Sequence, residues 1–198
     1  MMLDISDVKD VVTDVRPAIF DSFTVRELSE DELRTLDSPI TERLRLHERL
    51  EPLSDDFKDA LVEKEYSEPV IDAIGSNEEA EIYMDAELEC SEVNGKDALI
   101  RSDIDLDKTD DFGNTNLERM ERGKSPLDKD GKPIELHHIG QTSDAPLAEL
   151  TKAEHMGNGN DSVLHDKLKE SEIDRAEFKK EREEHWKARA EDIKHNLE

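Results

Sequence analysis

The feature that most constrains the fold is a tight-turn sequence at residues 128–131, DKDG, followed by two short apolar stretches. Residues 132–139 and 145–151 have the length and apolar content of strands, and GQTSD between them is rich in turn-forming residues. Beyond them the sequence predicts a helical turn, a break at GNGN, a helix from about Asp161 that packs across the hairpin 132–151, and a last long helix capped by Ser171 and Asp174. The predicted order of strand, strand, helix, helix indicates an α+β fold.

Two adjacent histidines, His137 and His138, lie in the first of these strands. Successive side chains of a strand point to opposite faces, so a regular strand would direct only one of them inward. If both histidines serve one site, we expect the strand to bend or to end at this pair.

The N-terminal part of the chain has acidic helical patterns. Residues 29–36 and 54–66 each begin with a serine and an acidic first turn, which predicts N-capped helices. Residues 76–88 predict a helix capped by Asn77, and Asn94-Gly95 predicts a two-residue hairpin turn. We therefore place a domain boundary near residue 75. The acidic, mainly helical region 1–75 is interpreted either as a delivery or docking segment or as a solvated extension.

The charge of the chain is strongly negative and unevenly distributed. The 53 Asp and Glu residues exceed the 27 Lys and Arg residues, which gives a net charge of −26. Residues 120–198 hold 19 acidic and 14 basic side chains, so most of the excess precedes them. Nucleic acid binding depends on Lys and Arg that displace counterions from phosphates. We therefore expect only the C-terminal part to contact DNA, with a metal ion supplying much of the positive charge.

Six of the seven histidines lie between residues 137 and 195. Imidazole can act as a base near neutral pH or as a metal ligand, so His137, His138, His155 and His165 could supply two of the functions that phosphodiester hydrolysis needs. His155 and His165 would diverge by roughly 80° on one continuous helix, but GNGN interrupts it. The alternative for all four is a structural role, which is the interpretation of His47, His185 and His195.

The single cysteine, Cys90, excludes an intramolecular disulfide and a cysteine-based zinc site. No apolar stretch approaches the roughly 18 residues of a membrane span. The N-terminal sequence has neither the basic nor the apolar region of a Sec signal, so we expect any export to use a specialised system.

Three stretches, GKPIELHHIGQ, APLAELTKAEH and GNGNDSVLH, resemble the LHH family of the HNH/endonuclease VII superfamily, the predicted nuclease modules of bacterial polymorphic toxins. The resemblance extends from about residue 76 to residue 190. It implies that residues 76–198 form a nuclease domain with a ββα-metal core and additional helices, and that this domain cleaves DNA with a divalent ion such as Mg²⁺, Mn²⁺, Ni²⁺ or Zn²⁺.

The same resemblance implies roles for individual residues. His137 corresponds to a metal ligand and His138 to the general base, while His155 and His165 correspond to the remaining site histidines. We assign the metal to His137 and His165, and the choice between His155 and His165 stays open. Candidates for the asparagine of the HNH motif are Asn158 and Asn160. Candidates for phosphate contacts are Arg119, Arg122, Lys124, Lys132 and the basic residues of the last helix, although six basic and six acidic side chains at 171–190 favour an ion-paired helix face.

The resemblance further implies a toxin that is delivered into a competing cell, acts in its cytoplasm and is neutralised in the producing cell by a cognate immunity protein. The alternative class is a non-catalytic interaction protein whose acidic surface mimics nucleic acid or docks on a secretion machine.

Overall fold

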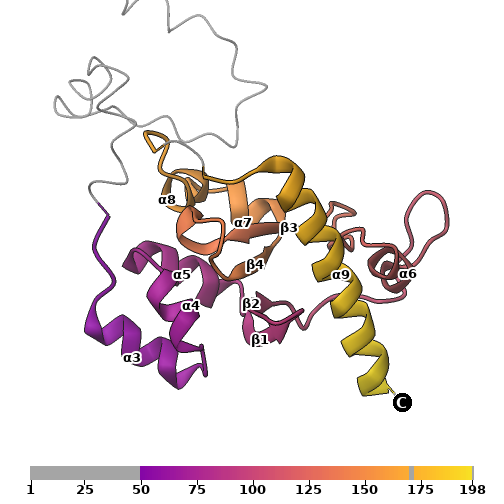
Figure 1. Ribbon diagram of the computed structural model, residues 1–198, viewed down its shortest axis with the longest axis horizontal. Coiled ribbons are helices and arrows are strands. Elements are labelled where there is room, and N and C mark those ends of the chain that lie inside the picture. Colours follow the sequence, from indigo (N-terminus) through magenta and orange to yellow (C-terminus); the bar gives the residue numbers. More distant parts are fainter. Residues whose placement is uncertain (1–49, 170–171, 198) are drawn as a thin grey trace, which may run out of the picture. The chain divides into compact units, whose positions relative to one another are not determined.

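In the computed structural model, which describes residues 50–169 and 172–197, short helices precede a four-stranded sheet, and a long helix ends the described chain (Figure 1). The sheet has the order β1-β2-β4-β3, with antiparallel β1–β2 and β3–β4 pairs and a parallel β2–β4 pair at its centre. This mixed architecture confirms the predicted α+β class. The elements are α3 (Asp55–Glu63), α4 (Glu68–Ala73), α5 (Asn77–Asp85), β1 (Glu89–Val93), β2 (Lys96–Ile100), α6 (Asn116–Glu121), β3 (Glu135–His138), the 3₁₀ turn η3 (Ile139–Gln141), β4 (Leu147–Leu150), α7 (Lys152–Met156), α8 (Asn160–Leu164) and α9 (Arg175–Leu197).

Local sequence signals account for the first helices and the first hairpin. Ser54 caps α3 as predicted, because its hydroxyl accepts a hydrogen bond from the Phe57 amide. The cap of α5 is Ser76, and the prediction of Asn77 was wrong: Ser76 is extended and accepts from the Glu79 amide. The Asn94-Gly95 turn is confirmed, and both residues have the positive φ that a two-residue hairpin of this type requires.

The second hairpin is confirmed, but its first strand is shorter than predicted. β3 pairs antiparallel with β4 over four residues, whereas we expected a strand over 132–139. Residue 132 still belongs to the turn, since its amide donates to the Asp128 carboxylate. At the other end the strand stops at His138, and η3 follows. Gly140 has a φ of 68°, and a Cβ there would lie 2.6 Å from the Ala73 carbonyl oxygen, so this close turn depends on glycine.

Two helices pack on the hairpin, one on each face: α9, and the predicted helix from about residue 161, whose Leu164 shares a core with Ala148 and Leu150. That helix, α8, has only five residues and ends before His165, which is extended. α9 begins at Arg175, where the Asp174 carboxylate accepts from the amides of Ala176 and Glu177. Ser171, the predicted cap, lies outside the described residues.

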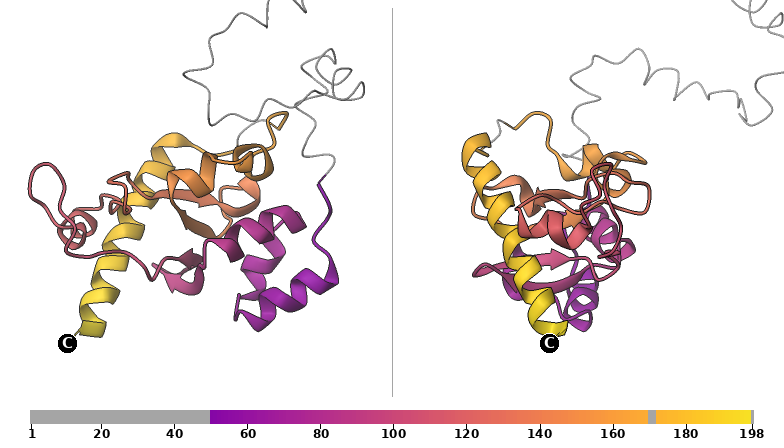
Figure 2. Two further views of the ribbon diagram at one scale, coloured as in Figure 1. Left: turned by 180° about the vertical axis from the view of Figure 1, so that it is seen from behind. Right: turned by 90° about the vertical axis from the view of Figure 1, so that its right-hand side faces the viewer.

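Both faces of the sheet are covered. Leu136 and Leu147 share a core with Trp186 and Ala190 of α9, whereas Ala148 and Leu150 face a second core formed with α3, α4, α5 and α8. The right-hand view of Figure 2 shows α9 on one side of the strands and α3–α5 on the other. Because β3 and β4 are covered on both faces, their alternate residues point into two different interiors.

A buried ion network fixes α9 against β4. The Glu149 carboxylate is fully buried and accepts hydrogen bonds from His185 Nε2 and Arg189 Nε, both at 2.8 Å, and from the Arg101 amide. Burial would raise the pKa of Glu149, but the His185 hydrogen bond and the Arg189 charge lower it below its usual value. His185 is therefore structural, as predicted.

The predicted boundary near residue 75 falls inside a shared core. Leu61, Tyr66 and Val70 precede it and belong to the same buried cluster as Leu99 and Leu150, which follow it. The division of function between 1–75 and 76–198 stays a prediction. The predicted helix at 29–36 and His47 lie outside the described residues, and none of the described helices has the length and apolar character needed to span a bilayer.

Candidate metal centre

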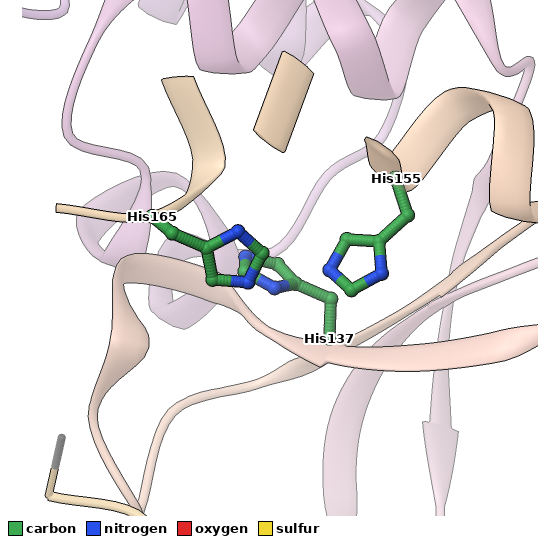
Figure 3. Close-up of side chains that lie close together, drawn as sticks. All are labelled: His137, His155 and His165. Carbon is green, nitrogen blue, oxygen red and sulfur yellow. The ribbon is translucent and has the colours of Figure 1, made fainter. Parts of the chain in front are cut away.

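Three histidines from different elements converge on one face of the sheet. His137 lies on β3, His155 in the last turn of α7 and His165 at the C-terminal cap of α8. Their ring centroids are separated by 5.1 Å, 5.1 Å and 4.9 Å, and one ring nitrogen from each lies within 4.8 Å of the other two. Figure 3 shows the three rings gathered in one place from three segments of the chain.

The local sequence explains how α7 and α8 deliver two of these rings. A capping box between Thr151 and Glu154 starts α7 directly after β4. The predicted break at GNGN is confirmed, because α7 ends at Met156 and α8 starts at Asn160. The side-chain amide of Asn160 donates to the Glu154 carbonyl at 2.7 Å and links the two short helices. His165 thereby returns to the ring of His155, which a continuous helix would not allow.

The Nδ1 atoms of two of the histidines lie within hydrogen-bond distance of carboxylate or carbonyl oxygens. His155 Nδ1 donates to Glu135 Oε2 at 2.7 Å, and His165 Nδ1 lies 3.0 Å from Asp161 Oδ1 and 3.1 Å from the Asp161 carbonyl. A hydrogen bond at Nδ1 places the proton there and leaves Nε2 with its lone pair. Such outer contacts are typical of metal-binding imidazoles.

The Nε2 atoms of His137 and His155 are buried and have no hydrogen-bond partner among the described residues. An unsatisfied buried nitrogen is costly, and a bound cation would satisfy it. Burial, followed by the neighbouring His155, His165 and His138, lowers the pKa of His137 well below its usual value. Burial and then His155 also lower the pKa of His165. Neutral imidazoles are the ligand form, so the cluster fits a divalent ion bound by three nitrogens with open coordination positions.

His138 points to the opposite face, toward α9. Its Nε2 lies 2.9 Å from Oε2 of Glu181. The other carboxylate oxygen of Glu181 accepts a hydrogen bond from Lys96 Nζ at 2.6 Å. The centroid of the His138 ring lies 4.5 Å from that of the Phe178 ring. Burial lowers the pKa of His138, although Glu181 acts in the opposite direction. Both histidines are nearly inaccessible, with exposed fractions of 4% and 5%.

A pocket of about 210 Å³ connects the two sides at the end of β3. The predicted strand end at the histidine pair is confirmed, and His138 lines the same pocket as the other three rings. The pocket is lined by Leu136, His137, His138, Gln141, His155, His165, Lys169, Ile173 and Phe178.

The structure thus brings all four predicted histidines to one pocket and adds carboxylates that the sequence analysis missed. Glu135 stands two residues before His137, on the same face of β3, so strand alternation could have identified it. Glu181 lies 43 residues after His138, and no local signal points to it. Of the predicted phosphate contacts, Arg119 binds the Asp110 carboxylate and Arg122 donates to the Asn114 side chain.

One comparison with known proteins bears on this site. The family model LHH, described as a nuclease of the HNH/ENDO VII superfamily with conserved LHH, matches residues 115–192. This segment includes Leu136-His137-His138, His155, His165 and most of α9. No solved structure matches the chain.

Proposed function

Residues 115–192 belong to the LHH family of the HNH/ENDO VII nuclease superfamily, and we propose that this protein is a metal-dependent endonuclease that hydrolyses DNA phosphodiester bonds. The observation that carries the proposal is the triad of His137, His155 and His165, in which two buried Nε2 atoms have no partner among the described residues. The family match supports nuclease activity, whereas the metal requirement and the DNA substrate are our inference.

In this proposal the three imidazoles hold the ion, and their outer contacts orient them. Glu135 fixes the His155 ring and Asp161 fixes the His165 ring. A divalent ion bound there would supply a Lewis acid for the phosphate oxygens and the leaving oxygen. The sequence analysis left open whether His155 or His165 binds the metal. In this proposal both of them do.

His138 is the proposed general base. The Glu181 carboxylate accepts from Nε2–H, so Nδ1 is the atom left to take a proton from the attacking water. Glu181 is in turn held by Lys96, which limits rotation of the carboxylate. The proposed division of labour therefore follows the two faces of β3: His137 binds the ion from one face, and His138 approaches from the other.

The test is cleavage of supercoiled plasmid by the full chain with Mg²⁺, Mn²⁺, Ni²⁺ or Zn²⁺, with and without chelator, and with a labelled RNA in parallel. We expect metal-dependent nicking of DNA, its loss in His137→Ala, and its retention in His195→Ala, which changes an exposed histidine outside the pocket. Absence of cleavage with every ion would instead favour the acidic interaction protein, and cleavage of RNA alone would reassign the substrate.

The proposed biological role is that of a toxin delivered without a Sec signal into the cytoplasm of a competing cell, with a cognate immunity protein in the producer. Induced expression of the full chain in a bacterial host should then stop growth, whereas the His137→Ala chain should not. Equal growth of cells with comparable amounts of the two folded proteins would contradict this role.

A further inference from the structure

A second hollow adjoins the histidine pocket. It has a volume of about 510 Å³ and shares the lining residues Leu136, His155 and Phe178 with the smaller pocket, so the two are adjacent. Its walls come from the loop after α6, the start of β3 and one side of α9. A groove of this size that leads to a candidate nuclease centre is suited to a segment of the substrate.

The loop after α6 closes one side of this groove against α9. Gly123 has a φ of 70°, and a Cβ there would lie 2.9 Å from the Glu183 carbonyl oxygen. Only glycine allows so close an approach of loop and helix. The buried Trp186 lies on the same stretch of α9 and lines the groove as well. This wall of the groove is therefore formed by close packing of the loop against α9.

The carboxylates along the groove have partners, but one cation has none. Glu135 binds His155, and Glu183 lies 3.9 Å from Lys179, which bears out the predicted ion-paired helix face for that pair. Arg182 also lines the groove, and among residues 50–169 and 172–197 no carboxylate forms an ion pair with it. Its exposed guanidinium is free to bind an anion.

Phe178 holds this guanidinium at the junction of the two hollows. The central carbon of the Arg182 guanidinium lies 4.8 Å from the centroid of the Phe178 ring. The same ring lies 4.5 Å from His138 and lines both hollows. Arg182 and His138 thus contact the same aromatic ring, and the contact of Arg182 leaves its N–H groups available.

We propose that Arg182 binds a backbone phosphate of the DNA strand next to the scissile one, and that the strand lies in the groove between α9 and the start of β3. This inference rests on the proposed function and specifies how its substrate is held. A guanidinium binds phosphate oxygens through two parallel hydrogen bonds, which fixes position as well as supplying charge. In a chain with a net charge of −26, such a local cation is needed to counter the general repulsion of DNA.

The test compares Arg182→Ala, Arg182→Lys and Lys187→Ala in the full chain. Lys187→Ala is the matched control, because it removes the same charge from the exposed side of the same helix, outside both hollows. Binding of a labelled DNA duplex is measured by fluorescence anisotropy at several salt concentrations with chelator present, and kcat and KM are measured with metal.

We expect Arg182→Ala to weaken binding and raise KM about ten-fold or more, because a charged hydrogen-bonding group is lost. The salt dependence of binding should fall by about one phosphate contact. Arg182→Lys should be intermediate, since it keeps the charge without the planar fork. Lys187→Ala should resemble the wild type, and all three variants should keep the wild-type melting temperature because both side chains are exposed.

Three results would overturn the inference. If the wild type binds and cleaves DNA but Arg182→Ala matches Lys187→Ala in affinity and KM, the groove contact is wrong while the proposed function stands. The same holds if Arg182→Ala lowers kcat with affinity and KM unchanged. If the wild type neither binds nor cleaves DNA, both the inference and the proposed function fail.

Discussion

Two adjacent histidines can serve one site although their side chains leave the strand on opposite faces. His137 enters the pocket from the α7–α8 side, and His138 enters it from the α9 side at the point where β3 ends. Strand alternation, applied to a sheet with one solvent face, would have directed one ring to water. Here both faces are covered, so both rings are buried.

The substitutions His137→Ala and His138→Ala should impair cleavage in different ways. His137→Ala removes a proposed ligand, so calorimetric titration should show weaker metal binding, and excess metal should restore some cleavage. His138→Ala leaves the three ligands in place and should keep metal affinity, while loss of a general base lowers the rate by roughly 10²–10⁴-fold. Equal loss of metal binding in the two variants would show shared ligation and would contradict the division of roles.

Glu135 should matter for metal affinity without touching the ion. Its carboxylate accepts the Nδ1–H of His155 at 2.7 Å and fixes that ring. Glu135→Gln weakens this contact, and we expect metal affinity to fall roughly 10–100-fold. Glu191→Gln, an exposed change of the same kind on α9, is the control. Unchanged affinity in Glu135→Gln would show that the ring does not need this partner.

At the scale of elements, the sequence was most informative where a single residue type is required. The Asn94-Gly95 hairpin and the Ser54 cap follow from local chemistry and are confirmed. The length of β3 was overestimated because its ends are set by distant contacts, such as the approach of Gly140 to α4. The role of α9 could not be predicted, since Glu149 and its partners His185 and Arg189 are about 40 residues apart.

The docking of α9 should depend on Glu149. Glu149→Gln leaves the buried Arg189 without its carboxylate, and breaking such a buried pair costs about 3–5 kcal/mol of the free energy of unfolding. Urea unfolding of wild type and variant measures this loss. A difference below about 1 kcal/mol would mean that the network contributes little to the position of α9.

The same carboxylate gives a pH dependence with a defined sign. The pKa of Glu149 is lowered in the folded protein, so its contribution is fully present above the unfolded value of about 4.3 and is lost as the pH falls through the lower folded value. The difference in stability between wild type and Glu149→Gln should therefore shrink on acidification below about pH 4.3. A difference that is constant with pH would contradict the ionised state of Glu149.

At the scale of the whole molecule, the helices before residue 75 belong to the core of the sheet. Leu61, Val70 and Ile71 are buried there, and burial of each such side chain contributes about 1.5–3 kcal/mol. Their combined loss is comparable to the total stability of a typical domain. We therefore expect residues 76–198 alone to lack a cooperative thermal transition that the full chain shows. A cooperative transition of the fragment near that of the full chain would support residue 75 as a domain boundary.

The four site histidines could be selected from the sequence because they cluster and because the Leu136-His137-His138 motif is distinctive. The sequence did not show which of these histidines share a face of β3, because that depends on which helices cover each side of the strand. The net charge of −26 indicated the need for a cation, and the structure adds where one would lie, between the imidazoles of His137, His155 and His165. The charge and the motif could therefore be recognised in the sequence, but the geometry of the site could not.

The central claim is that His137, His155 and His165 bind one divalent ion. Anomalous diffraction from crystals of the full chain grown with Zn²⁺, recorded on both sides of the zinc absorption edge, tests it most directly. The account predicts one strong peak within about 2.0–2.1 Å of a ring nitrogen from each of the three histidines. A fully occupied zinc site elsewhere, with no peak among these three rings, would contradict it.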